Sequence, residues 1–330
     1  MKKWEFIIGV DVSRNTLDVH CPERDVYVQI KNGKEGFRAL EKWCGANRIE
    51  LAKSMVVMEY TGGYEYKLVS FCEAKGILYA RVPGLEIKRS LGIARGKNDR
   101  VDAKRIAQYA DQRHKTIRPS RPLDHKVKAL KELLGFRKAL VREKAGHQAR
   151  IKERMHMYPD LKKDFILQES RRRSRTNEAA IKRADREIAE LIKSDGAMWA
   201  NYILITSIKG VGPVNAAMTI SYTENFTGFP DARSYAVYVG VVPFDHISGT
   251  SIRGRKRVSH LANIKLKAEL TQAAKSAMQH DPEIKAYAER KLLNKPYGLV
   301  VNNVKFKIIL RIFAVVKRGS KFVENYKNVA

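Results

Sequence analysis

The chain has 330 residues and carries 64 Lys and Arg against 35 Asp and Glu, which gives a formal net charge of +29. So much self-repelling charge raises the energy of the compact state, which argues against an enzyme of small neutral metabolites and favours a polyanionic partner, most commonly nucleic acid. Apolar residues make up 44% of the chain, which argues against disorder, and the length allows two or three domains.

The first third of the chain has the pattern of an α/β domain. Apolar runs predict strands over residues 5–10, 16–21, 26–30, 54–58 and 77–82. Between and after them, we predict helices over residues 34–48, 64–74 and 99–112. The order βββαβαβα indicates an antiparallel meander joined to parallel crossover units, hence a mixed sheet with helices on its faces. The dipeptide Pro83-Gly84 is expected to end the last strand.

Two prolines, Pro119 and Pro122, mark the end of this domain, and we place its boundary at residue 120. Residues 121–198 are predicted to form an antiparallel helical hairpin or coiled coil. Its tip is expected to carry a basic run that includes Arg171, Arg172 and Arg173. Such a hairpin can be a dimerising arm, or two packed helices with solvated outer faces. Residues 199–330 have mostly helical patterns and are predicted to form a C-terminal domain.

Cysteine spacing and hydropathy bear on the compartment. The three cysteines, Cys21, Cys44 and Cys72, are scattered and lack metal-ligand spacing, which argues against a disulfide framework or zinc finger and favours a reducing cytoplasm. No run approaches 18 uncharged apolar residues, so we expect no membrane partner.

Four carboxylates occupy positions that suggest chemistry. Asp11 and Glu59 each end an apolar strand, where a carboxylate costs several kcal/mol unless a metal ion or dense hydrogen bonding compensates for it. Asp99 and Asp102, at i and i+3, face one way across the first turn of a helix. Crossover topology can bring these elements together, so the four groups could hold two Mg²⁺ ions for a phosphodiester displacement. Taken singly, Asp99 could be a helix N-cap, Asp102 a first-turn residue and Glu59 a surface residue.

Two further segments of the last third could contact nucleic acid. The stretch from Ser248 has flanking glycines and a basic set that could grip phosphates, namely Arg253, Arg255, Lys256 and Arg257. A phosphate-cradling loop is the first interpretation here and a nucleophilic serine the second, since no motif names a base. The turn around Lys209, Gly210 and Gly212 resembles a helix-hairpin-helix turn, although a packing turn has the same signature.

Together these motifs resemble the DEDD-type insertion-sequence transposases, the bridge-RNA-guided serine recombinases related to the pilin-gene invertase. The resemblance covers essentially the whole chain. It rests on Gly-Val-Asp11, Val-Met-Glu59-Tyr-Thr-Gly, Lys-Asn-Asp99-Arg-Val-Asp102-Ala, Gly-Val-Gly-Pro213, Gly-Val-Val-Pro243 and Ser248-Gly-Thr-Ser-Ile-Arg-Gly. The family usually shows Ser-Lys-x-Gly after the serine motif, whereas this chain has Ser259-His260-Leu261-Ala262.

The resemblance implies a RuvC-like N-terminal domain of ribonuclease-H fold, a coiled-coil arm and a C-terminal transposase domain. It implies that Asp11, Glu59, Asp99 and Asp102 bind Mg²⁺, and that Ser248 attacks the DNA phosphate and forms a 5′-phosphoserine link. It therefore reverses the first interpretation of Ser248, although Ser251 remains an alternative nucleophile. It also implies a structured non-coding guide RNA pairing with donor and target DNA, and dimers that assemble into tetramers with composite sites.

The sequence thus predicts a DNA transposase or recombinase that excises and inserts its own mobile element. One rival is a RuvC-like junction-resolving nuclease, in which metal-activated water cuts DNA without a covalent protein adduct. Another is a non-catalytic nucleic-acid-binding protein, which would keep its function without the four carboxylates. Neither rival needs a Ser248-Gly-Thr-Ser segment in a basic, glycine-flanked setting.

Overall fold

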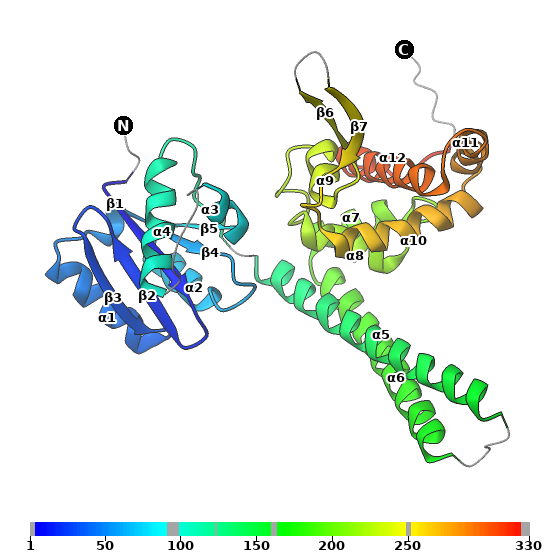
Figure 1. Cartoon of the computed structure of the whole chain (residues 1–330), viewed down its shortest axis with the longest axis horizontal. Coiled ribbons are helices and arrows are strands. Elements are labelled where there is room, and N and C mark those ends of the chain that lie inside the picture. Colours follow the sequence, from blue (N-terminus) through cyan, green and yellow to red (C-terminus); the bar gives the residue numbers. More distant parts are fainter. Residues whose placement is uncertain (1–3, 91–98, 123, 160–163, 249–251, 325–330) are drawn as a thin grey trace. The chain divides into compact units, whose positions relative to one another are not determined.

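The structure is a computed structural model, and it describes residues 4–90, 99–122, 124–159, 164–248 and 252–324. The chain divides into two compact units, Met1–Pro122 and Leu123–Ala330. Figure 1 shows the first unit in blue to cyan and the second in green to red. None of the helices in these described ranges is long and apolar enough to cross a membrane.

A five-stranded mixed sheet forms the centre of the first unit. Its strands are β1 (Phe6–Val12), β2 (Thr16–Cys21), β3 (Val26–Lys31), β4 (Ser54–Glu59) and β5 (Leu78–Val82). Their spatial order is β3-β2-β1-β4-β5. β1 runs antiparallel to β2 and parallel to β4, so the meander and the crossover units meet at β1. The predicted mixed α/β architecture is confirmed.

Helices cover both faces of this sheet (Figure 1). They are α1 (Lys34–Ala46), α2 (Tyr66–Lys75), α3 (Gly84–Ser90) and α4 (Asp99–Gln112), with a short 3-10 turn η1 (Leu51–Lys53) before β4. On one face, Ile7, Met55 and Val57 pack against Ile106 and Ala107 of α4. On the other, α1 and α2 meet through the stacked rings of Phe37 and Phe71, whose centroids are 4.9 Å apart.

The helix α3 was not predicted. Pro83 and Gly84 follow β5 as expected, but they also start a helix, because the Pro83 carbonyl accepts the backbone N–H groups of Glu86 and Ile87. Proline is well suited to a helix start, where its missing N–H costs nothing. The three cysteines are buried free thiols, and burial raises the pKa of each to about 12.

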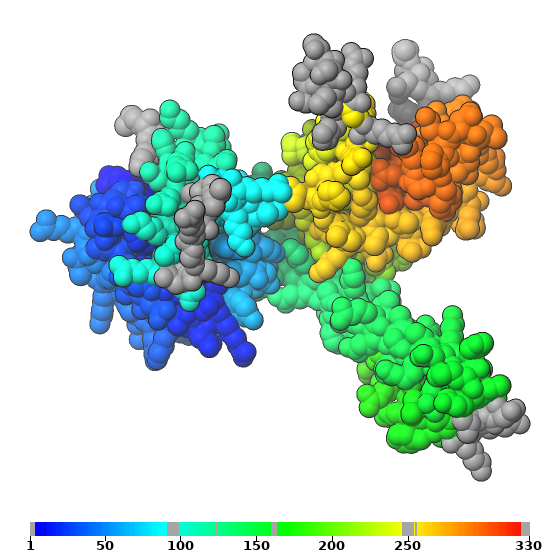
Figure 2. Space-filling view, in the orientation of Figure 1, coloured from blue at the N-terminus to red at the C-terminus, as the bar shows by residue number. Residues whose placement is uncertain are grey.

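The second unit is helical apart from one pair of strands. Its elements are α5 (His125–Met157), α6 (Phe165–Lys193), α7 (Gly196–Thr206), α8 (Pro213–Tyr222), α9 (Ala232–Val239), β6 (Pro243–Ser248), β7 (Ile252–Val258), α10 (Ile264–His280), α11 (Pro282–Leu292) and α12 (Tyr297–Arg318). The long helices α5 and α6 pair as the predicted hairpin and extend away from the other helices of this unit (Figures 1 and 2).

The base of the hairpin belongs to the core of the second unit. Leu130 of α5 and Ile192 of α6 are fully buried in one cluster with Ile205 of α7 and Ile308 of α12. The sequence predicted a domain boundary between the hairpin and the C-terminal helices at residue 199. In the structure, the two regions form one compact unit.

The structure refines two details of this half. The basic residues Arg171, Arg172 and Arg173 lie in the first turns of α6, at the tip end of the hairpin, where Arg171 donates to the sulfur of Met155 near the end of α5. The segment that starts at Ser248 is not simply a loop. It contributes to the antiparallel pair β6–β7, in which Ser248 is the last residue of β6 and pairs with Ile252.

Candidate active site

Gly9 shows which face of the sheet carries the predicted carboxylates. A Cβ at Gly9 would lie 2.5 Å from the backbone N of Ala107 and 2.6 Å from the carbonyl O of Ala103, so β1 touches the backbone of α4 there. Side chains alternate along a strand, so Asp11, two residues later, belongs to the same face as Gly9. Asp11 therefore lies on the face that α4 covers.

The register of the sheet aligns three carboxylates on that face. Asp11 pairs directly with Asp18 of β2. On the other side, Gly9 pairs with Val57 of β4, and Glu59 lies two residues further along the same face. Asp18, Asp11 and Glu59 thus occupy neighbouring positions on three adjacent strands.

The first turn of α4 supplies two more carboxylates. Asp99 and Asp102 lie in the first turn of this helix, and Ala103, next to Asp102, is one of the two α4 residues against Gly9. Arg105 donates to Oδ1 of Asp102 across 3.0 Å, which orients that carboxylate. We call these five side chains, Asp18, Asp11, Glu59, Asp99 and Asp102, the acidic edge.

Partial burial and the neighbouring carboxylates both raise the pKa of Asp11. It rises from 3.8 to about 6, first because the group is partly buried and then because Asp102, Asp99, Glu59 and Asp18 repel its negative charge. Five acids around one point form a region of concentrated negative charge in a chain whose net charge is +29. Strongly shifted groups of this kind cluster at functional sites.

Asp18 is the member of the acidic edge that sequence reasoning missed. It is only 2% exposed, and it accepts hydrogen bonds from the Tyr27 hydroxyl and from the Gln29 amide at 3.1 Å. The Arg100 guanidinium, on α4 between the two aspartates, lies 4.9 Å from the centroid of the Tyr27 ring. The only signal in the sequence was an acid in the middle of a predicted strand, between Leu17 and Val19.

Two other residues that sequence reasoning missed hold the ends of the strands. The Asn32 amide donates to the carbonyls of Ser13 at 2.8 Å and Tyr64 at 3.0 Å, which ties together the loops that follow β1 and β4. Gly84 leaves room for Glu59, because a Cβ at that position would lie 1.9 Å from its Oε1. Both contacts depend on the tertiary fold, so the periodicity of apolar residues in the sequence could not predict them.

The donors of the acidic edge suit a hard cation, since all are carboxylate oxygens. Mutual repulsion of the kind that raises the pKa of Asp11 is relieved when a cation binds. Within the described residues, no three His, Cys, Asp or Glu side chains are already spaced to share one metal ion.

The predicted serine lies in the other unit. Ser248 ends β6, whereas Gly249 and the alternative Ser251 lie outside the described residues. The predicted basic set beside it lies entirely on β7: Arg253, Arg255, Lys256 and Arg257. Lys256 is paired with Asp245 of β6 at 2.7 Å, and Arg257 is exposed.

Two of the basic residues predicted on the hairpin also have partners within the chain. Arg172 and Arg173 both donate to Glu169, and these bonds lower the pKa of Glu169 to about 2. Arg171 donates weakly to the sulfur of Met155, at 3.6 Å.

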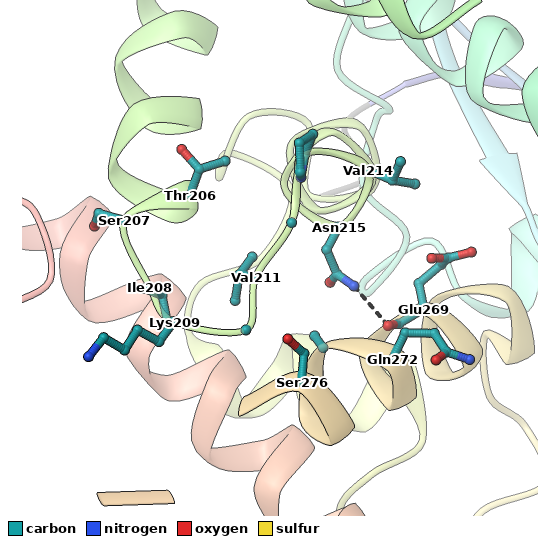
Figure 3. Close-up of a pocket in the computed structure, with 14 residues that line it drawn as sticks. Thr206, Ser207, Ile208, Lys209, Val211, Val214, Asn215, Glu269, Gln272 and Ser276 are labelled. Carbon is teal, nitrogen blue, oxygen red and sulfur yellow. Dashed lines mark hydrogen bonds between the residues drawn. The ribbon is translucent and has the colours of Figure 1, made fainter. Parts of the chain in front are cut away.

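The turn at Lys209 borders an open groove of about 550 Å³, which we call the Lys209 groove (Figure 3). Lys209 forms an ion pair with Glu324. Gly210 has a φ of +90°, and a Cβ there would meet the backbone N of Ala277 at 2.7 Å, so close packing on α10 requires this glycine. Gly212 faces open space and precedes the first turn of α8, which has no side-chain cap.

Comparison with known families assigns the chain to a class of mobile-element enzymes. A DEDD-type model for IS110 proteins, described as "Transposase", matches residues 8–158. A second model, "Transposase IS116/IS110/IS902 family", matches residues 202–289. The two matches together span well over half of the chain, which therefore belongs to the IS110 family of transposases.

Individual relatives agree with this family. The chain is 25% identical over 274 residues to the pilin gene-inverting proteins of Moraxella lacunata and Moraxella bovis, a match that covers 81% of each chain. It is 30% identical over 118 residues to an uncharacterised 43.6 kDa protein of insertion element IS110 from Streptomyces coelicolor. That match covers 36% of this chain and 29% of the relative. As a member of this family the protein is a DNA recombinase or transposase in general terms.

Proposed function

We propose that this transposase excises and inserts its own element by serine attack on DNA, with a Mg²⁺ site at the acidic edge of a RuvC-like domain of ribonuclease-H fold. The convergence of the carboxylates of β1, β4 and the first turn of α4 is the observation that carries the metal site, and the raised pKa of Asp11 supports it. Packing Asp11 among Asp102, Asp99, Glu59 and Asp18 costs free energy, and a function that needs concentrated negative charge would explain why the fold accepts it.

Asp11, Glu59, Asp99 and Asp102 are the residues that would hold the ions. Bound Mg²⁺, as a two-ion site, would stabilise the charge that develops on attacking and leaving oxygens during phosphodiester displacement. The chain's own part is positional. Parity along β1 and β4 puts two carboxylates on the α4 face, and the contact between Gly9 and α4 brings the other two over them.

Ser248 is the proposed nucleophile. Its Oγ forms a bond to phosphorus as the bond from phosphorus to the 3′ oxygen breaks, which leaves a 5′-phosphoserine and a free 3′-hydroxyl. The serine proton leaves for a base, and the departing 3′ oxygen takes one up. Attack by a 3′-hydroxyl of another strand reverses these steps and frees the serine, so strands are exchanged without loss of phosphodiester bonds.

The partners of this reaction would be donor and target DNA duplexes and a structured non-coding guide RNA that pairs with both. The names of the Moraxella relatives, pilin gene-inverting proteins, support a role in DNA recombination. We also propose a homodimer that assembles into a tetramer. The net charge of +29 suits contact with several nucleic-acid backbones at once.

The decisive experiment compares Ser248→Ala and Asp11→Ala with the wild type in a recombination assay and in denaturing gels of trapped reactions. We expect the wild type to form a covalent protein–DNA adduct, and both variants to lose the adduct and recombination while keeping RNA binding. Cleavage with no adduct in the wild type would favour the junction-resolving nuclease. Full function of Asp11→Ala would favour a non-catalytic binding protein.

The guide is tested separately, by purifying the protein without nuclease and sequencing the RNA that accompanies it. One defined structured RNA is the expected result. A mixture of unrelated cellular RNAs would remove the guided mechanism and leave the cleavage chemistry standing.

A further inference from the structure

A second cavity lies beside the Lys209 groove and has a different character. It is smaller and more enclosed, with a volume of about 180 Å³, and it lies among α5, α8 and α10. Both hollows are bordered by Val214 and Glu269, so they adjoin at the start of α8. We call it the Tyr222 cavity after its aromatic residue.

The wall of this cavity is apolar with one aromatic ring. Val214, Met218 and Tyr222 recur every four residues along α8 and so share one face of that helix. Leu134 of α5 contributes from the opposite side. A cavity of about six water volumes, at about 30 Å³ each, has room for one unpaired base and none for a base pair.

The rim of the cavity is basic. Lys131 lies with its Nζ 5.2 Å from the centroid of the Tyr222 ring, and Lys138 and Lys265 are exposed at the edge. A single base stacked on an aromatic ring, with its phosphate near lysines, is a recurring way in which proteins bind unpaired nucleic acid.

Glu269 gives the cavity a chemical preference. Its backbone carbonyl accepts a hydrogen bond from the Asn215 side chain at 2.8 Å, which fixes this residue of α10 against α8 (Figure 3). Figure 3 also shows its side chain on the Val214 side of the groove, away from Lys209. A carboxylate only accepts hydrogen bonds, so it favours a base with an exocyclic amino group, such as the N4 group of cytosine.

We propose that the Tyr222 cavity binds one unpaired nucleotide whose base carries an exocyclic amino group, with the adjoining backbone passing over the Lys209 groove. The proposal rests on the proposed function only in that the protein handles nucleic acid with unpaired bases. The nucleotide can come from a DNA strand or from an RNA, and the experiment distinguishes these two sources.

The test measures binding of the full-length, nucleic-acid-free protein to labelled single strands of equal length: oligo-dC, oligo-dT, oligo-rC and oligo-rU. A hydrogen bond to a charged group predicts about tenfold tighter binding of the cytosine strand than of its thymine or uracil counterpart. The sugar type that shows the preference identifies the source. Equal binding of cytosine and thymine or uracil strands would overturn the proposal.

Variants separate this site from general charge attraction. Glu269→Gln offers both a donor and an acceptor, so we expect the cytosine preference to fall below about threefold without loss of total affinity. Lys138→Ala should weaken binding of all strands more than Lys152→Ala, which removes the same charge from an exposed hairpin position outside the cavity. An unchanged preference in Glu269→Gln, or equal effects of the two lysine variants, would count against the site.

Tyr222→Leu keeps an apolar side chain and removes the stacking surface, so binding of every strand should weaken several-fold. If this variant melts early, Glu269→Gln decides alone, because its fold contact is made by the backbone. Failure of this site and failure of the proposed function are distinguishable. If the protein recombines DNA but shows no cytosine preference, only the proposal for the Tyr222 cavity is refuted. If it binds no nucleic acid, both that proposal and the proposed function are refuted.

Discussion

The acidic edge of the first unit and the basic candidates of the second are built in opposite ways. In the acidic edge, strand parity and a close helix contact bring like charges together, and burial together with their repulsion raises the pKa of Asp11 to about 6. In the second unit, Lys209, Lys256, Arg172 and Arg173 already have acidic partners within the chain. The first arrangement costs stability and therefore indicates a specific role. The second costs little and is the ordinary condition of a basic surface.

The largest expected effect tests the acidic edge as a catalytic site. Glu59→Gln keeps the size of the side chain and removes its charge, so we expect recombination to fall by at least a hundredfold, about 2.7 kcal/mol in the barrier. Quantified recombinant product is the measurement. Glu35→Gln, at an exposed position of α1, is the matched control and should change the rate by less than twofold. A Glu59→Gln protein as active as this control would leave the acidic edge without a catalytic role.

The next effect tests the close contact that assembles the edge. Gly9→Ala places a methyl group against backbone atoms of Ala103 and Ala107, which cannot move aside as a side chain can. We expect the free energy of unfolding in urea to fall by about 2 kcal/mol. Gly45→Ala, in α1 with nothing near its added Cβ, should instead raise it by about 0.5 kcal/mol. Equal effects of the two would mean that α4 is not seated on β1 at Gly9.

Residue patterns predict the elements of the edge better than its contacts. The apolar runs that end at Asp11 and Glu59 gave their strands directly, because a buried strand has a short-range signature. The positions of Asp18, Gly9 and Gly84 beside them depend on register and on the approach of α4 and α3. Strand register and helix packing join residues far apart in the chain, so local periodicity cannot predict them.

In the second unit too, sequence patterns predicted some features and not others. Charge and glycine content drew attention to the segment from Ser248, but its strand pairing with Ile252 was missed. The strand β7 reads Ile-Arg-Gly-Arg-Lys-Arg-Val, and its many basic residues obscure the β pattern. The basic run near Arg172 lies close to the hairpin tip, as expected, but its charge did not indicate where α6 starts, whereas the capping residue Asp164 does.

A third prediction concerns the cost of gathering the acids. Asp11 has its pKa raised from 3.8 to about 6 on folding, so the folded state holds its proton more tightly, and stability is lost as pH rises through that range. Asp11→Asn removes this loss. With EDTA at pH 7.5 we expect the variant to be more stable by about 1 kcal/mol, after allowance for solvent screening, and equal to the wild type below about pH 4.

Chemical denaturation at several pH values in EDTA measures this difference. Repeating the series with Mg²⁺ supplies the control, because an ion bound by the folded wild type adds stability that the variant lacks. A constant difference at every pH would show that Asp11 acts through packing and not through charge.

The smallest effect tests whether pairing within the chain restrains the basic surface. Asp245 and Lys256 are exposed on neighbouring strands, and their ion pair offsets part of the positive charge beside Ser248. Asp245→Asn removes one negative charge and frees Lys256 for phosphate, so duplex DNA should bind about twofold to threefold more tightly. Arg257→Ala, on the same strand, should do the opposite and lower the salt dependence of binding by about one phosphate contact. Fluorescence anisotropy across a salt series measures both. If both variants leave the salt slope unchanged, DNA does not pass along β7. In that case the acidic edge would have a specific role, whereas the basic residues of β7 would have none in DNA binding.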